Sequence, residues 1–186
     1  MRTRLSSAGL DVYRQEGLEA VSFRRLAELL DVSHTLPYRY FQNKDALLAR
    51  MRADALGRFE SYVREHESRA DGPLAQVHAV ADAYIAFASR HQAEYLLIFA
   101  THQPAPELYP EVLQARRQVF DHAVEVLQRC IDAGLLRGEA LELAHALWIG
   151  LHGLMTLHVA GQLVHGRTLD ELVEPLLGRL LNAAKP

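Results

Sequence analysis

Hydroxyl and cationic side chains gather between residues 33 and 44 of this 186-residue chain. A Tyr38-Arg39-Tyr40 run stands there, with Thr35 before it and Lys44 after it. Guanidinium and hydroxyl groups bind phosphates and base edges, and a cation beside a helix start can share a phosphate with the backbone amides. The segment therefore indicates contact with a nucleic acid.

Ten histidines raise metal binding as an alternative. Two pairs stand at two-turn helical spacing, namely His145 with His152 and His158 with His165. Seven helical residues rise about 10.5 Å, which is too far for one ion. His91 and Glu94 are close enough but have no third ligand nearby in the sequence. We expect neither a metal nor another cofactor, and we keep a metal-sensing regulator as an alternative.

Motifs for catalysis are absent from the sequence. It holds no hydrolase nucleophile elbow, dinucleotide loop, phosphate loop or zinc-protease pair. Cys130 is the single cysteine and has no indicated activating partner. We therefore expect no enzyme. A lone cysteine forms no internal disulfide, and residues 1–11 resemble no signal peptide, so we expect a cytoplasmic location.

Helical spacing of apolar residues runs through the chain, and sustained strand-like alternation is missing. Expected N-caps are Ser22, Ser33, Asn43 and Thr168, and expected C-terminal caps are Gly17 and Gly134. The sequence predicts an all-α fold of about nine helices, over about 5–15, 22–30, 33–40, 44–69, 73–89, 90–100, 111–133, 139–164 and 169–181.

The helices expected at 22–30 and 33–40 form a helix-turn-helix, with Ala27 at their crossing and Val32 in the turn. The stretch resembles the TetR family of bacterial transcriptional regulators. The resemblance is carried by Gly17, Val21-Ser22, Val32-Ser33, Tyr38-Arg39-Tyr40-Phe41, Lys44 and Leu47-Leu48. Asp31 stands where the family usually has glycine, and Thr35-Leu36-Pro37-Tyr38 where it commonly has Gly-Thr-Leu-Tyr. The resemblance implies a DNA-binding domain over residues 1–46.

The resemblance also implies roles for single residues in that domain. Thr35, Leu36 and Arg39 would face base edges or groove walls. Phosphate and sugar contacts would come from Tyr38, Tyr40 and Lys44, with Ser22 and Arg24 touching the DNA backbone at the start of the first helix of the pair. The alternative is that Tyr38, Tyr40 and Phe41 close a small three-helix core, which we favour for Phe41.

Residues 47–186 would form a helical ligand-binding and dimerisation domain. Trp148-Ile-Gly-Leu-His-Gly153 resembles the signature of a TetR C-terminal subgroup named for Trp, His and Gly. The resemblance implies a homodimer through the helices at about 139–164 and 169–181. Leu143–Gly166 has no Asp, Glu, Lys or Arg and is long enough to span a membrane. Its four histidines favour a buried or dimer-forming helix instead.

A small-molecule effector in the C-terminal domain is a further implication of the resemblance. Aromatic side chains would line an apolar site, and histidines would anchor polar groups. An ordinary aromatic core is the alternative. The candidates are Tyr84, Phe87, Tyr95, Phe99, His102, Phe120, Trp148 and His152.

The formal net charge of −3 excludes a uniformly basic coating protein but leaves room for a local basic face. Residues 1–50 carry eight Lys/Arg against six Asp/Glu. The sequence as a whole predicts a dimeric, ligand-responsive DNA-binding regulator, a repressor that a small molecule releases from its operator. A helical adaptor that binds protein is the alternative from another class.

Overall fold

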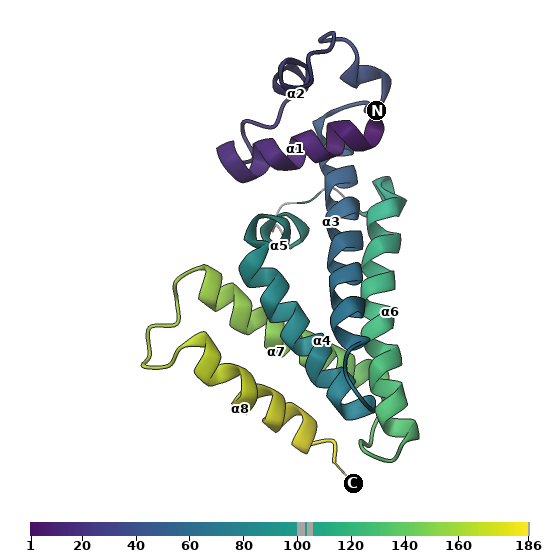
Figure 1. Ribbon diagram of the computed structural model, residues 1–186, viewed down its shortest axis with the longest axis vertical. Coiled ribbons are helices and arrows are strands. Elements are labelled where there is room, and N and C mark those ends of the chain that lie inside the picture. The colour runs from purple at the N-terminus through teal and green to yellow at the C-terminus, as the bar shows by residue number, and fades with distance from the viewer. Residues whose placement is uncertain (100–102, 104–105, 186) are drawn as a thin grey trace. The chain divides into compact units, whose positions relative to one another are not determined.

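The computed structural model of the chain describes residues 1–99, 103 and 106–185. These residues form eight α-helices and two 3-10 turns, without a strand, so the all-α prediction is confirmed (Figure 1). The elements are α1 (Arg2–Glu16), α2 (Phe23–Leu30), η1 (Pro37–Arg39), α3 (Lys44–Glu67), α4 (Pro73–Arg90), α5 (Gln92–Ile98), η2 (Pro106–Leu108), α6 (Pro110–Asp132), α7 (Ala140–Val159) and α8 (Leu169–Asn182).

The second helix of the expected helix-turn-helix, at 33–40, is instead a turn followed by the 3-10 element η1. Pro37 has no N–H and cannot donate to the carbonyl of Ser33, as an α-helix would require. Bonds between residues three apart take over, from Leu36 N to Ser33 O at 2.9 Å and from Arg39 N to Leu36 O at 3.1 Å.

The apolar helix expected to reach residue 164 ends at Val159. Gly161 adopts a φ of 66° and reverses the chain. Its N–H donates to His158 O at 3.0 Å, and the N–H of Gln162 donates to Leu157 O at 2.8 Å. These two bonds satisfy the last carbonyls and form a glycine cap, which the sequence analysis did not predict.

Three of the four expected N-caps are confirmed, and Ser33 is not one of them because no α-helix follows it. Ser22 Oγ accepts a bond from Arg25 N at 3.2 Å, and Asn43 Oδ1 accepts one from Ala46 N at 2.9 Å. At α8, Thr168 and Glu171 bond each other's backbone amides reciprocally. Local side-chain chemistry therefore sets where α2, α3 and α8 begin.

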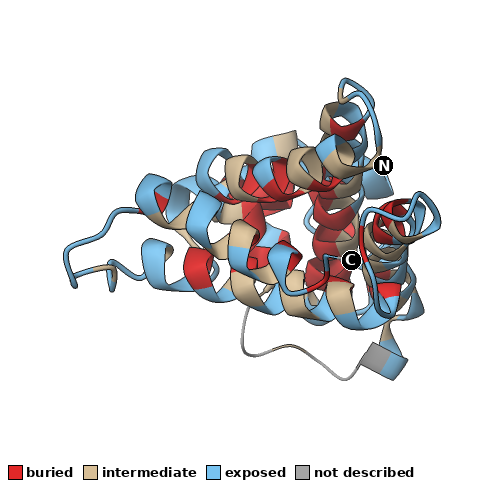
Figure 2. Ribbon diagram, turned by 90° about the horizontal axis from the view of Figure 1, so that it is seen from below, coloured by how far each residue is buried: buried red, intermediate tan, exposed pale blue. Residues whose placement is uncertain are grey.

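The described residues divide into two compact units. The first unit is Met1–Arg58 with Ala93–Arg117, and the second is Phe59–Gln92 with Gln118–Pro186. In the first unit, α1, α2 and the start of α3 enclose Leu5, Leu26, Phe41 and Leu47, all nearly inaccessible to solvent. Leu97 of α5 belongs to the same apolar cluster. Figure 2 shows the buried residues along one side of the helices and the exposed residues along the other.

The second unit is built on α4, α7 and α8, with the larger part of α6. In Figure 1, α7 and α8 lie side by side, and they are in contact. Gly150 allows that contact, because a Cβ there would lie 3.1 Å from Leu180 Cδ1. Helix α7 is also long and apolar enough to span a membrane by length and composition.

Candidate DNA-binding surface and effector residues

A tight turn at Asp31 joins α2 to the segment that carries the candidate DNA contacts. Asp31 has φ 53° and ψ 53°, the left-handed conformation that the family's glycine favours. Aspartate tolerates this conformation better than most residues. The N–H of Val32 bonds Ala27 O at 3.0 Å, and the N–H of Asp31 bonds Glu28 O at 3.3 Å. The turn is therefore complete without glycine.

The segment after the turn presents polar side chains to solvent. Thr35, Tyr38, Arg39 and Tyr40 are exposed, and Tyr38 keeps 65% of its surface accessible. Leu36 is half-buried. The segment is held from beneath by Pro37 and Phe41, both buried. Phe41 is therefore a core residue, as the sequence analysis favoured.

Neighbouring side chains orient the exposed ones. The rings of Tyr38 and Phe23 meet edge to face at 4.7 Å, which fixes the phenol while its hydroxyl end stays accessible. Thr35 Oγ1 lies 2.9 Å from Ser33 Oγ. Arg39 forms no ion pair with any described residue, so its guanidinium is available to an external anion.

The remaining candidate contacts are engaged within the protein. Ser22 caps α2, and Arg24 Nε lies 3.0 Å from Glu28 Oε1. Lys44 Nζ donates to the carbonyl of Leu18 at 2.9 Å. Ser22 and Arg24 are exposed and Lys44 is half-buried, so a phosphate could reach them, but only by sharing or replacing these partners.

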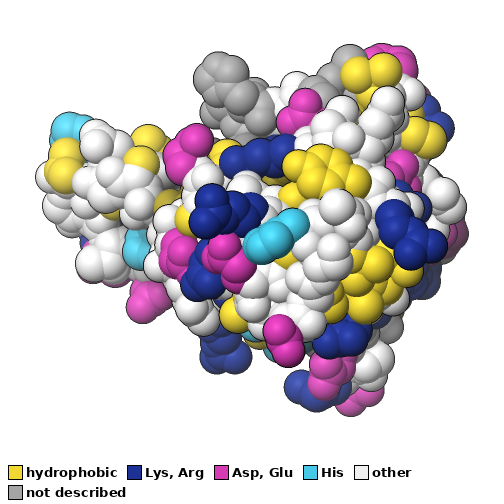
Figure 3. Space-filling model, turned by 90° about the horizontal axis from the view of Figure 1, so that it is seen from above, with side chains coloured by type: hydrophobic (Ala, Val, Ile, Leu, Met, Phe, Trp, Pro, Cys, Tyr) yellow, Lys and Arg dark blue, Asp and Glu magenta, His cyan; other side chains and the backbone are white. Residues whose placement is uncertain are grey.

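Basic and acidic groups are mixed on this part of the chain. On the face drawn in Figure 3, Lys and Arg side chains lie beside Asp and Glu side chains. Arg25 Nη2 is 2.7 Å from Glu16 Oε1, and this bond lowers the pKa of the Glu16 carboxyl. Arg39 is one of the cations of this region that have no acidic partner among the described residues.

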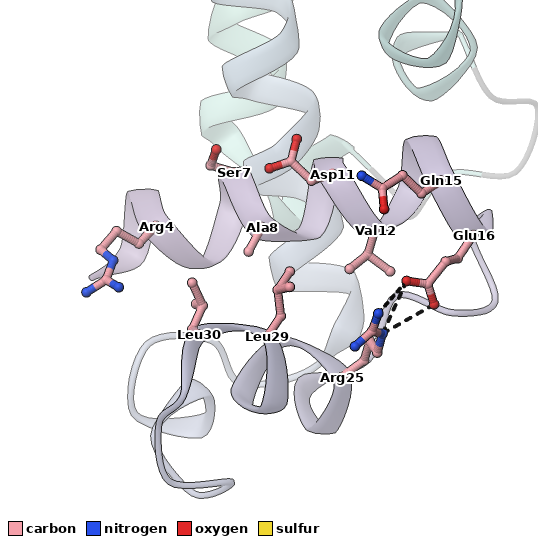
Figure 4. Close-up of a pocket in the computed structure, with 10 residues that line it drawn as sticks. All are labelled: Arg4, Ser7, Ala8, Asp11, Val12, Gln15, Glu16, Arg25, Leu29 and Leu30. Atoms are coloured by element: carbon pink, nitrogen blue, oxygen red, sulfur yellow. Dashed lines mark hydrogen bonds and ion pairs between the residues drawn. The ribbon is translucent and has the colours of Figure 1, made fainter.

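A groove of about 420 Å³ lies between α1 and α2 (Figure 4). The Arg25–Glu16 pair bridges it, and Leu29, 48% exposed, forms part of its apolar lining. None of the candidate DNA contacts lines this groove. Its lining residues are Arg4, Ser7, Ala8, Asp11, Val12, Gln15, Glu16, Arg25, Leu29 and Leu30.

Five candidate effector residues belong to the second unit, and four of them form one connected series of contacts. Tyr84 Oη lies 3.2 Å from His152 Nδ1. The Trp148 ring lies 6.0 Å from those of both His152 and Phe120. Burial lowers the pKa of His152, which favours the neutral imidazole. Phe87 joins Tyr84 indirectly, through Phe59.

The other candidates lie elsewhere. Tyr95 and Phe99 belong to the first unit, where their rings are 5.0 Å apart. His102 lies outside the described residues. A single site lined by all eight candidates therefore remains a prediction.

Sequence reasoning missed several aromatic members of the second unit. Phe59 contacts both Tyr84 and Phe87, at 5.5 and 4.9 Å between ring centroids. Tyr62 contacts His66, at 4.2 Å, and Phe87. Phe59, Tyr62 and His66 are spaced so that they share one face of the helix, and this spacing could have predicted their contact from the sequence. In the described part of the chain, no three His, Cys, Asp or Glu side chains are arranged to hold a metal ion.

Comparison with known families agrees with this architecture. Residues 5–51 match the model described as bacterial regulatory proteins, tetR family, and residues 77–180 match the tetracyclin repressor-like C-terminal domain. The chain belongs to the TetR family. It is therefore a transcriptional regulator with a helix-turn-helix DNA-binding domain rather than an enzyme. The C-terminal match is compatible with the Trp-His-Gly subgroup that the sequence resembles.

Solved structures share the fold over nearly the whole chain. A protein of unknown function from Rhodococcus sp. RHA1 is 25% identical, with 100% of this chain and 95% of that chain covered and a TM-score of 0.87. FadR from Bacillus subtilis, solved with stearoyl-CoA, is 15% identical, with 97% and 98% covered and a TM-score of 0.78. The ketosteroid regulator KstR2 of Mycobacterium tuberculosis is 15% identical, with 100% and 95% covered and a TM-score of 0.66. No curated protein matches the sequence.

Proposed function

We propose that the protein is a cytoplasmic, dimeric repressor that binds operator DNA and is released from it by a small, largely apolar molecule. The observation that carries the proposal is the exposed polar segment after the Asp31 turn. There, Thr35, Tyr38 and Tyr40 flank an unpaired Arg39 above a buried proline and phenylalanine. An anchored, solvent-facing turn of this composition suits insertion into the major groove.

The dimer contact is proposed on α7. Large apolar side chains of this helix remain exposed in the single chain, with Leu141 at 52%, Ile149 at 64% and Leu157 at 48%. Ile149 and Leu157 lie about 80° apart around the helix, with Gly153 between them at a position where a Cβ would meet open space, whereas Leu141 lies about 160° from Leu157. A second copy of α7 and α8 would bury the face that carries Ile149 and Leu157. Two-fold symmetry would then set the two DNA-reading turns about 34–36 Å apart.

The effector is proposed to bind at aromatic residues of the C-terminal domain. Tyr84 and His152 provide a neutral polar pair beside the Trp148 ring, which suits a mostly apolar molecule with a hydrogen-bonding group. The stearoyl-CoA complex of FadR supports an apolar effector by analogy of fold alone.

Release from DNA requires that the effector bind the two dimer geometries with different affinity. The link available within one chain is α3, because it passes from the first unit into the second at Arg58–Phe59. The effector would favour a geometry in which the two DNA-reading turns no longer match successive grooves.

The test is fluorescence anisotropy with the DNA upstream of the protein's own gene and a shuffled duplex, over a salt series. We expect preferential binding that weakens steeply as salt rises, because phosphate contacts release counterions. Equal binding to both duplexes with little salt dependence would contradict the proposal and favour the protein-binding adaptor.

Variants of the proposed contacts sharpen that test. Arg39→Ala should reduce the preference for the specific duplex, because its guanidinium faces bases. Lys44→Ala should weaken binding to both duplexes and lower the salt slope. Arg64→Ala is the matched control, since Arg64 pairs with Glu60 and lies outside the proposed surface. If all three variants behave alike, the assigned roles are wrong.

A further inference from the structure

Two arginines from different helices meet at the C-terminal end of α5. Arg52 of α3 is only 3% exposed, and its Nε donates to Leu97 O at 3.2 Å. Arg116 of α6 is half-buried, and its Nη2 donates to Ile98 O at 3.4 Å and also to Gln103 Oε1. All of these residues belong to the first unit. The two guanidinium groups therefore bind neighbouring carbonyl oxygens at the end of α5.

Arg52 and Arg116 have no acidic partner among the described residues, whereas the buried carboxylates Glu94 and Glu67 each pair with an arginine. Glu94 pairs with Arg14, and Glu67 pairs with Arg129. By contrast, no described carboxylate lies at ion-pair distance from Arg52 or Arg116. Carbonyl oxygens carry only partial charge, so they compensate a buried guanidinium incompletely.

The electrostatics of the two guanidiniums agree with this geometry. Burial lowers the pKa of Arg52, and repulsion from Arg116 lowers it further, against a weaker attraction from Asp45. Burial also lowers the pKa of Arg116. The protein thus holds a buried and a half-buried cation that repel each other, an arrangement that a bound anion would relieve.

The pair also retains unused donors. An arginine has five N–H groups in a planar fork that matches a carboxylate or a phosphate. Arg52 donates to the protein through Nε, and Arg116 through Nη2. Tyr95 and Phe99, with rings 5.0 Å apart, belong to the same end of α5, so apolar surface is close along the chain.

We propose that Arg52 and Arg116 form an oxyanion-binding site that takes a carboxylate or phosphate group. The occupant is either a small organic acid or a free inorganic anion, and both arginines belong to the first unit. In the first case the acid has an aromatic or aliphatic body that suits the Tyr95 and Phe99 rings.

The experiment compares two fluorescent probes that differ by one anionic group, anilinonaphthalene sulfonate and the uncharged phenylnaphthylamine. Both are titrated into the full-length protein, and inorganic phosphate is then added as a competitor. Hydrogen bonds to charged groups predict that the wild type binds the sulfonate probe about tenfold more tightly, or better.

Arg116→Gln should abolish most of this preference, and Arg117→Gln should retain it. Arg117 is the adjacent, exposed residue of the same helix and provides the matched control. Arg116→Gln is preferred to a change at Arg52, because Arg52 lies in the core and its loss could unfold the domain. Thermal denaturation of each variant checks that it is folded.

Two results support the site and identify its occupant. If phosphate at millimolar concentration displaces the sulfonate probe from the wild type but not from Arg116→Gln, the occupant is a free inorganic anion. If phosphate does not compete while the sulfonate preference depends on Arg116, the occupant is an organic acid.

Equal affinity of the wild type for both probes, or equal loss of the preference in both variants, would overturn the proposal. Operator binding is measured in parallel without any probe. Protein that binds DNA but does not prefer the anionic probe refutes this site alone. Protein that prefers the anion but does not bind DNA refutes the proposed function instead.

Discussion

Replacing Glu94 by glutamine tests whether a buried ion pair fastens α5 to α1. The Glu94 side chain is 3% exposed, its Oε1 accepts a hydrogen bond from Arg14 Nη2, and Arg58 Nε lies 3.9 Å away. Burial raises the pKa of this carboxyl, but the hydrogen bond and the charges of both arginines together lower it below its usual 4.5. The ionised form is therefore the one that stabilises the fold.

Glutamine preserves the shape of the side chain and removes its charge. Hydrogen bonds between charged partners contribute about 1.5–3 kcal/mol, and neutral ones about 0.5–1.5 kcal/mol. Glu94→Gln should therefore lower the free energy of unfolding by about 1–2 kcal/mol at neutral pH. For a chain of this length the loss corresponds to a fall in Tm of about 2–8 °C.

The loss should depend on pH. Because the folded-state pKa of Glu94 lies below its unfolded value, the ionised carboxylate contributes its full stabilisation above pH 4.5. That contribution disappears as the pH falls through the folded-state pKa, so the wild type and Glu94→Gln should converge in acid. Urea denaturation followed by circular dichroism measures both, at one fixed protein concentration because dimerisation adds to stability.

Asp11→Asn is the matched control. Asp11 Oδ1 also lies 3.1 Å from Arg14 Nη1, but its side chain is 51% exposed. An exposed pair contributes about 0–1 kcal/mol, so this variant should lose clearly less than Glu94→Gln. Equal losses in the two variants, or a Glu94→Gln loss that stays constant from neutral to acidic pH, would refute the reasoning.

Three further predictions concern local structure and assembly. Asp31→Gly should raise the free energy of unfolding by about 1 kcal/mol, because glycine has no Cβ to strain at φ 53°; an unchanged or lower value in urea denaturation would contradict this. Thr168→Ala should lower it by about 1 kcal/mol through loss of the α8 cap, and a loss below a few tenths would show that the cap contributes little. Ile149→Asp should convert the dimer to monomers in sedimentation, whereas Leu135→Asp, at an exposed apolar residue outside α7, should leave the dimer intact; a dimer in both variants would contradict an interface on α7.

Local chemistry explains which parts of the fold the sequence predicts well. Ser22, Asn43 and Thr168 each bond an amide within three residues, so their roles follow from neighbours in sequence. The left-handed turn at Asp31 also follows from residue type, because aspartate tolerates this conformation better than most residues. The helix predicted over 33–40 was wrong, because Pro37 within it has no N–H to donate and the segment forms a 3-10 element instead.

Long-range pairing explains what the sequence could not predict. Arg14 and Glu94 are 80 residues apart, and their contact depends on how α5 returns to the first unit. The same holds for Arg52 and Arg116, which sequence analysis did not select because isolated arginines on amphipathic helices are usually solvated. The aromatic candidates were chosen by residue type, and type alone does not assign them to one unit or the other.

The uninterrupted length of α3 has a mechanical consequence. Its 24 residues form a rod of about 36 Å, without a proline to act as a hinge. A tilt of about 5° about one end of such a rod displaces the other end by about 3 Å. Successive base pairs of DNA are separated by about 3.4 Å, so a tilt this small shifts an attached reading element by nearly one base pair.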